Sequence, residues 1–189
     1  MSKFIKPEKI IVDDLVLKPI PVSQDYVQQI YDAFHEDEQS FRFWMENGIY
    51  KTVQEVLNAY KTKYTDEENW EYAMYGIFNK DELLGEIGLS GIDVKNQTAE
   101  IGYWLKKSAR GKGLIDKLIP IIESLGFETL NLRKITIWCD TENIASRRHA
   151  EKNKYVLEGI QRERKLWMDG SVRSTAMFGK LKSEYKNIK

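Results

Sequence analysis

The stretches 98-TAEIGYWLKK-107 and 108-SARGKGLIDKLIPIIESLG-126 carry the pattern that decides the fold. An alternating apolar run leads into a turn with two glycines and two cations, and a strongly apolar segment follows. A strand that passes through such a turn into a helix exposes backbone amides at the helix N-terminus, where the helix dipole favours an anion. Gly111 and Gly113 let the backbone approach that anion, and Arg110 and Lys112 add positive charge. The stretch therefore predicts a pyrophosphate site, with a plain surface turn as the alternative.

The composition is that of a globular protein. The chain has 189 residues, of which 42% are hydrophobic and 31% charged, with a formal net charge of zero. This length predicts a single domain over 1–189, and the neutral charge argues against a general nucleic-acid binder. The sequence has no signal-peptide pattern and no apolar run of about 18 residues, so we expect no membrane span and a cytoplasmic location. The single cysteine, Cys139, lies in an apolar run and is expected to be a small buried residue.

Periodicity predicts a mixed α/β (α+β) fold with about seven strands in one mostly antiparallel sheet flanked by helices. Short turns between neighbouring strands indicate hairpins, whereas a strand that is followed by a helix indicates a crossover. The expected strands are 14–20, 70–78, 82–92, 98–105, 134–139, 155–165 and 172–181. The expected helices are 23–36, 52–64, 112–126 and 143–152, with caps at Ser23, Thr52 and Asn143.

Two common nucleotide-binding motifs do not fit the glycine turn. A dinucleotide fold needs G-x-G-x-x-G, and RGKGLI at 110–115 has only the first two glycines. A P-loop needs G-x-x-x-x-G-K-[ST], which does not occur in the chain.

Four motifs in order give the chain a family resemblance. They are AEIGYWL at 99–105, RGKG at 110–113, NIAS at 143–146 and KNKYVLEG at 152–159. This series resembles the GNAT superfamily of acetyl-CoA-dependent N-acetyltransferases, and within it the RimJ/RimL-like branch of ribosomal-protein N-terminal acetyltransferases. The resemblance runs from about residue 10 to residue 182.

The resemblance implies where acetyl-CoA would bind. In such enzymes the strand before the glycine turn, here 99–105, splays from the next parallel strand, here 134–139. Unpaired amides in the gap bind pantetheine and polarise the thioester carbonyl. The implied cofactor contacts are Tyr103, Trp104, Leu105, Arg110, Gly111, Lys112, Gly113, Leu114, Ile115, Asn143 and Ser146. No metal site is expected.

The catalytic residues follow from the same resemblance. Ser146 is the expected donor to the departing thiolate, with a tolerated polar helix residue as the alternative. Asn143 is expected to be a helix cap, a pantetheine contact or both. Glu100 is the expected general base, with an exposed strand residue as the equal alternative and Glu86 as a second candidate.

Several residues depart from the family pattern or leave questions open. RimL-like enzymes place a base on the penultimate strand, where this chain has Lys165 and Leu166 and where Glu163 is out of register. Pro120 predicts a bend rather than a break in its helix. A family glycine is missing near Asn153 and Lys154, and Asn153 is the expected left-handed residue. His35 and His149 are expected on the surface.

The acceptor is an amine of undetermined type. The acidic runs at 35–38 and 66–69 favour a cationic acceptor, although such runs are also typical of solvated surface. A protein N-terminus, a polyamine or other small amine, and an amino-sugar antibiotic all fit. The expected partners are acetyl-CoA and this acceptor, with no nucleic acid or membrane and with a homodimer left open. A module of the same fold that binds CoA or senses a ligand without turnover is the alternative to an enzyme.

Overall fold

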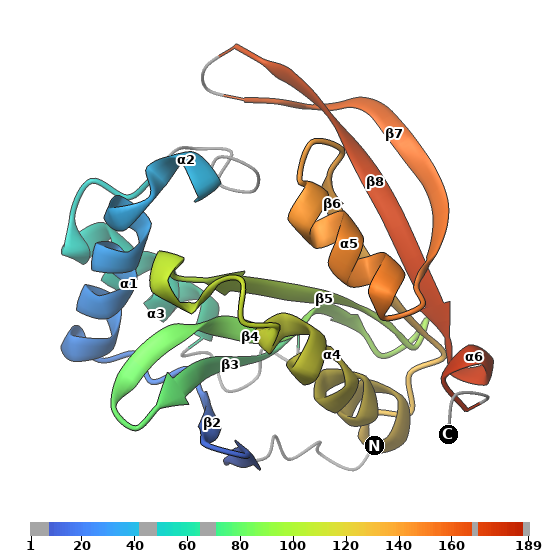
Figure 1. The fold of residues 1–189 in the computed structure, drawn as a ribbon, viewed down its shortest axis with the longest axis horizontal. Helices are drawn as coiled ribbons and strands as arrows, with labels where there is room; N and C mark the ends of the chain where they lie inside the picture. The colour runs from blue at the N-terminus through green and yellow to red at the C-terminus, as the bar shows by residue number, and fades with distance from the viewer. Residues whose placement is uncertain (1–7, 42–48, 65–70, 168–169, 187–189) are drawn as a thin grey trace.

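A computed structural model describes residues 8–41, 49–64, 71–167 and 170–186. Its centre is an eight-stranded sheet in the order β1-β2-β3-β4-β5-β6-β8-β7 (Figure 1). Neighbouring strands are antiparallel except β5 and β6, which are parallel. The strands are β1 (Ile10–Val12), β2 (Leu15–Pro19), β3 (Tyr72–Asn79), β4 (Glu82–Asp93), β5 (Thr98–Leu105), β6 (Lys134–Asp140), β7 (Val156–Leu166) and β8 (Val172–Leu181).

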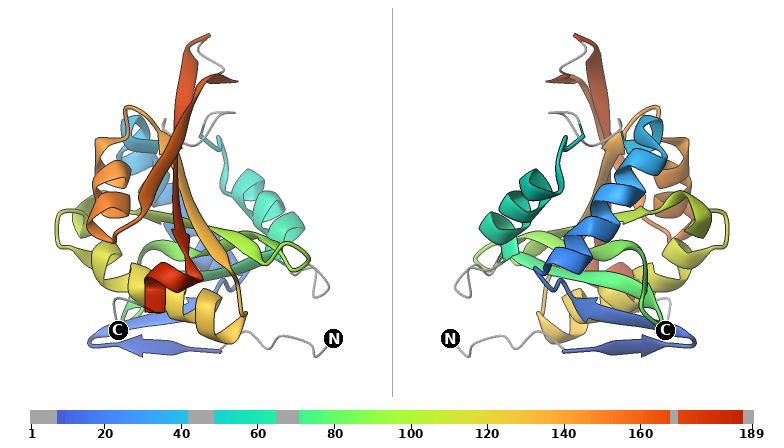
Figure 2. Two further views of the ribbon diagram at one scale, coloured as in Figure 1. Left: turned by 90° about the vertical axis from the view of Figure 1, so that its right-hand side faces the viewer. Right: turned by 90° about the vertical axis from the view of Figure 1, so that its left-hand side faces the viewer.

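The helices cover both faces of this sheet. They are α1 (Gln24–Glu36), α2 (Glu38–Phe41), α3 (Val53–Tyr64), α4 (Leu114–Ser124), α5 (Ile144–Lys152) and α6 (Lys182–Lys186), with a 3-10 turn at Lys107–Ala109 and a π-helical turn at Leu125–Thr129. One core cluster joins α4 and α5 to the sheet, and a second joins α1 and α3 to Phe78, Leu83 and Trp104. Figure 2 shows α3 on the opposite side of the sheet from α4 and α5.

The predicted splay between two parallel strands is present. β5 and β6 pair only at Thr98–Lys134, Ala99–Ile135 and Glu100–Thr136. Beyond Glu100, β5 stays paired with β4 as far as Leu105, while β6 stays paired with β8 as far as Asp140. The two strands therefore part in the middle of the sheet, between α4 and the long β7–β8 hairpin (Figure 1).

Local sequence signals account for most of the element boundaries. Ser23 Oγ accepts from the Tyr26 amide at 3.3 Å, and Thr52 Oγ1 accepts from the Glu55 amide at 3.2 Å. Asn143 Oδ1 accepts from the Ser146 amide at 3.1 Å, so the three predicted caps are confirmed.

Other boundaries differ from the prediction. The short β1 and α2 were not expected, and α4 begins at Leu114 because the turn before it holds two left-handed glycines. α4 runs through Pro120 without a break, as predicted.

The prediction that Asn153 takes the left-handed conformation is wrong, because Asn153 has φ −85° and Lys154 has φ 63°. Asn153 instead uses its side chain to bond the His149 carbonyl oxygen at 2.9 Å.

A pair of glycines that face each other across β4 and β5 tests how tightly the sheet is packed. A Cβ on Gly88 would lie 2.3 Å from the Ala73 carbonyl oxygen, whereas a Cβ on Gly102 would meet only Ser90 Oγ at 3.9 Å. We expect Gly88→Ala to lower the free energy of unfolding by about 1–3 kcal/mol, because backbone must move to relieve the clash. Gly102→Ala is the matched control and should be neutral or slightly stabilising. Urea denaturation measures both, and equal effects would contradict the packing described.

Candidate active site

The splay opens a cavity of about 980 Å³. Its walls come from α1 to α3, β4, the end of β5, the glycine turn, β6 and α5. Of the residues predicted from sequence, Glu100, Tyr103, Trp104, Leu105, Arg110, Gly111, Gly113, Leu114, Ile115, Asn143 and Ser146 all line it. The structure therefore brings together residues from three separate segments of the chain, and Lys112 is exposed beside them.

The end of β5 presents backbone groups to this cavity. Residues 101–105 have no ladder partner on the β6 side, because β6 pairs with β5 only as far as Glu100. Backbone N–H and C=O groups that lack a partner are normally satisfied by water or by a ligand. The unpaired edge is thus a place where an extended polar molecule could bind in line with the strand.

The glycine turn has the open geometry that an anion site needs. Gly111 and Gly113 have φ of 73° and 72°, in the left-handed region that favours glycine. No protein atom lies within 4 Å of where a Cβ would be at either position. Gly113 is the N-cap of α4 and has no side chain to bond the first amides of that helix. These amides therefore remain available to a bound anion.

Arg110 is tied to the protein rather than free. Its Nη1 donates to Ser40 Oγ at 2.7 Å and forms an ion pair with Asp37, and its Nε donates to the Leu105 carbonyl oxygen at 2.9 Å. The hydrogen bond from Ser40 is the largest effect on the pKa of the Asp37 carboxyl and lowers it. Burial raises that pKa, but the hydrogen bond and charge of Arg110 lower it further, so it stays below its usual value. Arg110 thus joins the end of β5 to the α1–α2 junction, and Asp37 offsets much of its charge.

Ser146 lies beside the end of β5. Its side chain is buried, and its Oγ lies 2.9 Å from the Tyr103 hydroxyl oxygen. Burial raises the pKa of Tyr103 well above its ordinary value, so this phenol keeps its proton at neutral pH. Cys139 is also buried, as predicted, and burial raises the pKa of its thiol. The Tyr103 and Ser146 hydroxyls therefore lie together in the cavity wall on the α5 side.

The expectation that His149 lies on the surface holds only in part, because its side chain is 27% exposed. His149 is half-buried in the cavity wall, with Nδ1 2.6 Å from Asp116 Oδ1 and its ring edge-on to Tyr103. Lys152 Nζ lies 2.6 Å from the other Asp116 oxygen. Burial raises the pKa of Asp116, but the bonds from Lys152 and His149 outweigh it and keep that pKa low. The helical spacing of Ser146 and His149 was the available signal, whereas Asp116 lies on another helix.

Two glutamates lie on the other side of the sheet. Glu100 is half-buried, and burial raises its pKa while Lys165 and Arg164 act in the opposite direction. Glu86 is 3% exposed, and both of its oxygens are used. Tyr26, Tyr60 and Trp104 donate to them at 2.7, 3.0 and 2.9 Å. Glu86 therefore serves as a structural anchor for α1, α3 and β5. Glu163, the third candidate, is exposed on β7.

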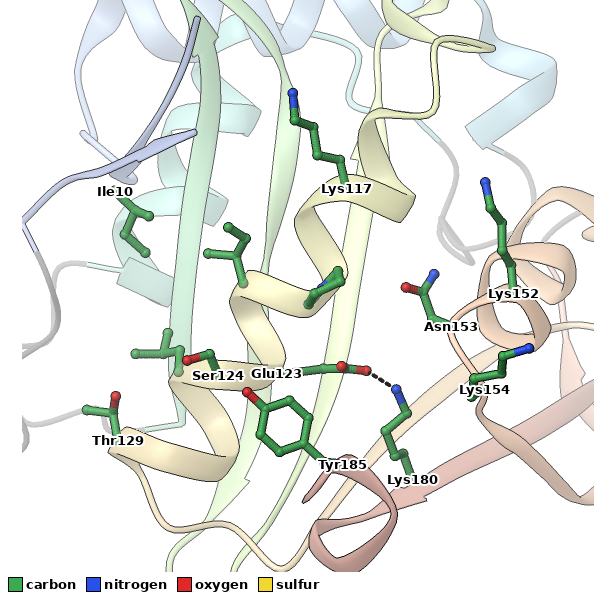
Figure 3. Close-up of a pocket in the computed structure, with 13 residues that line it drawn as sticks. Ile10, Lys117, Glu123, Ser124, Thr129, Lys152, Asn153, Lys154, Lys180 and Tyr185 are labelled. Atoms are coloured by element: carbon green, nitrogen blue, oxygen red, sulfur yellow. Dashed lines mark hydrogen bonds and ion pairs between the residues drawn. The ribbon is translucent and has the colours of Figure 1, made fainter. Parts of the chain in front are cut away.

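A second cavity, of about 700 Å³, lies beside the C-terminal half of α4 (Figure 3). Glu123 and Lys180 form an ion pair of 2.6 Å in its wall, and both side chains are less than 5% exposed. This pair ties α4 to β8. Lys152 borders both cavities.

The described residues contain no group of three or more His, Cys, Asp or Glu side chains arranged to hold a metal ion. None of the helices in the described part of the chain is long and apolar enough to cross a membrane.

Comparisons with known proteins agree with this geometry. A family model described as "Acetyltransferase (GNAT) domain" matches residues 14–156. The ribosomal-protein-serine acetyltransferase of Escherichia coli (strain K12) is 33% identical over 118 residues, which is 62% of either chain and so less than two thirds of that relative's length. The uncharacterized N-acetyltransferase YoaA of Bacillus subtilis (strain 168) is 29% identical over 153 residues, or 80% of this chain and 84% of that one.

Solved structures support the fold. Crystal form I (apo) of RimL, ribosomal L7/L12 alpha-N-protein acetyltransferase, gives a TM-score of 0.80 at 20% identity and covers 91% of this chain and 92% of that one. Microcin C7 self immunity acetyltransferase MccE, solved in complex with acetyl-CoA and AMP, gives 0.78 at 20% identity and covers 94% and 98%. Because the family model spans most of the sequence and the fold agrees with solved acetyltransferases, the chain belongs to the GNAT acetyltransferase family.

Proposed function

We propose that this protein transfers the acetyl group of acetyl-CoA to a primary amine by direct attack in a ternary complex, and that the acceptor is the α-amino group of a protein. The observation that carries the proposal is the early end of β5–β6 pairing beside an open glycine turn. The ribosomal-protein acetyltransferases among its relatives support the choice of acceptor. The expected cytoplasmic location belongs to the same proposal.

The residues around the splay fit acetyl-CoA. The amides of 110–115 would bind its pyrophosphate, and the unpaired edge of 101–105 would hold the pantetheine and polarise the thioester carbonyl. When bound, acetyl-CoA supplies an activated acyl group, so the protein itself needs no covalent nucleophile. The protein would have to orient the amine, remove its proton and return a proton on the thiol side.

The candidate base and the candidate proton donors lie on opposite faces of the sheet. Glu100 lies on the face covered by α1 and α3 and would accept the amine proton, directly or through a water molecule. Ser146 and Tyr103 lie on the α5 side and would donate toward the departing sulfur. Asn143 caps α5 and so orients the turn of helix that carries Ser146.

The direct test incubates the protein with acetyl-CoA and a panel of N-terminal peptides, polyamines and amino sugars. Free thiol release measures turnover, and mass spectrometry locates the acetyl group. We expect transfer to the α-amine of at least one peptide. Acetyl-CoA binding without transfer to any amine would instead favour a non-catalytic CoA-binding module.

Gly111→Asp tests the pyrophosphate site. The substitution adds an anionic side chain in the open space beside the helix N-terminus, so we expect acetyl-CoA affinity to fall at least about tenfold, or about 1.4 kcal/mol. Gly91→Asp is the matched control, because Gly91 also has a positive φ and open space around its Cβ but lies outside the cavity lining. Calorimetric titration compares the two, and equal affinities would rule out this anion site.

Ser146→Ala tests proton donation on the thiol side. A bond made mainly as charge develops on sulfur affects kcat more than KM. We expect kcat to fall about 10- to 100-fold, which corresponds to about 1.5–3 kcal/mol for a hydrogen bond to a charged group. The KM for acetyl-CoA should change little. Ser124→Ala, on the neighbouring α4, is the control. A variant with full kcat would show that Ser146 only packs in the helix.

Glu100→Gln tests the general base. Burial raises the Glu100 pKa above 4.5, so the carboxylate is the main form only above that raised value. The kcat/KM of the wild type should therefore fall as the pH drops below the raised pKa of Glu100. We expect the variant to lose about 10²–10⁴-fold in kcat and to lose this acidic limb, while acetyl-CoA binding is unchanged. Glu82→Gln, on β4, is the control. If the variant keeps the wild-type kcat and the same pH profile, the amine loses its proton to bulk water and not to Glu100.

A further inference from the structure

The cavity at the splay continues across the sheet face that carries Glu100. On this face Tyr72 on β3, Ser90 on β4 and Glu100 on β5 lie side by side, because Tyr72 pairs with Ser90 and Ser90 pairs with Glu100. Two residues further along β5, Gly102 faces Gly88 of β4. A Cβ on Gly102 would meet only Ser90 Oγ, at 3.9 Å, so the space above this glycine is open. The sheet therefore forms the floor of a trough that begins at Glu100.

Helix α3 forms a wall of this trough. Tyr60, Lys63 and Tyr64 line the cavity, and their spacing places them on one face of the helix. The Tyr64 ring lies edge-on to the Tyr72 ring, with 5.8 Å between the two centroids. Because Tyr72 lies at one end of the row of side chains that ends at Glu100, α3 reaches the end of the trough opposite Glu100.

The ammonium of Lys63 lies at that end of the trough. Its Nζ is 4.7 Å from the centroid of the Tyr72 ring and 5.3 Å from that of Tyr64. Lys63 is exposed, so a ligand can reach it. Partial burial of its ammonium still lowers its pKa, and the charge of Glu86 offsets only part of this effect. An anion bound beside Lys63 would therefore stabilise the charged form of this side chain.

Glu86 does not pair with Lys63 directly. Its two carboxylate oxygens accept from three neutral donors, Tyr26, Tyr60 and Trp104. The charge of Glu86 therefore acts on Lys63 only through space, and the ammonium keeps its capacity to bind an anion from outside the protein.

The acidic runs expected from the sequence do not change this. In the run 35–38, Asp37 and Glu38 have ion-pair partners of their own. The run 66–69 lies outside the described residues. Within the part of the chain that the structure describes, no carboxylate lies within ion-pair distance of Lys63, whose recorded contacts are with aromatic rings.

The spacing of the strands sets the distance between the two ends of the trough. Tyr72 and Glu100 are two strands apart, and neighbouring strands lie about 4.7–4.9 Å from each other, so the ends are about 10 Å apart. An extended chain advances about 3.3–3.6 Å per residue. A peptide with its amine at Glu100 would therefore place the side chain of its third residue near Lys63.

We propose that Lys63 forms an anion subsite at the end of the trough opposite Glu100, and that it selects acceptors with a carboxylate about 10 Å from the reacting amine. This inference rests on the proposed acetyl transfer and names its substrate class. The amine would face Glu100 while the carboxylate pairs with Lys63, and the part of the acceptor between them would lie over Gly102. A peptide with an acidic third residue and a small ω-amino acid of similar length offer the same chemistry.

The test compares matched acceptors with the full-length protein. The peptide pair is Ser-Ala-Asp-Ala and Ser-Ala-Asn-Ala, both with amidated C-termini, and the small-molecule pair is 8-aminooctanoate and 8-aminooctanamide. We expect kcat/KM to be at least about fivefold higher for the anionic member of at least one pair, as for a partly exposed hydrogen bond between charged groups. Preference in the peptide pair identifies a protein acceptor, and preference in the other pair alone identifies a small amino acid.

Variants locate the subsite. Lys63→Gln should bring the anionic-to-neutral ratio close to one through a higher KM for the anionic acceptor, with acetyl-CoA affinity unchanged. Lys63→Glu should shift the preference toward Ser-Ala-Lys-Ala. Lys61→Gln is the matched control, because it removes one positive charge from the same helix outside the cavity lining. The ratio cancels any change in Glu86 or Glu100 that slows all acceptors equally.

Three outcomes separate this inference from the proposed function. Transfer with equal kcat/KM for both members of each pair, or a preference that survives in Lys63→Gln, overturns the anion subsite and leaves the transferase intact. Failure to acetylate any amine overturns the proposed function. In that case calorimetric titration of both pairs into the CoA-loaded protein still tests the subsite, and equal affinities within each pair overturn it.

Discussion

The cavity depends on where parallel pairing between β5 and β6 ends. Both strands are held on their outer sides, β5 by β4 as far as Leu105 and β6 by β8 as far as Asp140. Divergence therefore leaves only one edge of each strand without partners, which is a limited cost that water or a ligand can offset. If pairing continued past Glu100, the sheet would satisfy its own amides and close the space between Tyr103 and Trp138. Incomplete hydrogen bonding at this point is thus what allows a binding site in the middle of a sheet.

A single buried carboxylate joins the elements that line one side of that space. Glu86 accepts from Tyr26 on α1, Tyr60 on α3 and Trp104 on β5, so it joins both covering helices to the strand that splays. Burial raises its pKa, and the three donors partly offset that effect. Removal of the carboxylate would leave three buried donors without an acceptor, and each would lose more than an ordinary hydrogen bond contributes. One buried carboxylate with three neutral donors therefore joins the elements of this cavity wall.

Sequence periodicity was sufficient to predict the main helices and strands. It could not predict the side-chain pairs that join segments far apart in the chain. The bounds of β5 and β8 match the prediction because alternation there is strong and turn residues flank both strands. The three-residue β1 was missed because a strand so short has too few residues to show a period. Pairs such as Arg110–Asp37 and His149–Asp116 join segments far apart in the chain, so no local pattern indicates them. Lys154 took the left-handed position because the side chain of Asn153 is used to bond Asp116 and His149.

The charges on either side of the splay depend on one another. β7 carries Arg164 and Lys165, whereas Glu100 lies on β5. Burial is the largest effect on the pKa of the Glu100 carboxyl, and it raises that pKa. Lys165 and Arg164 on β7 lower that pKa, against the larger effect of burial. The Glu100 pKa is therefore set by burial on β5 and by the positive charge of β7 together, and burial has the larger effect.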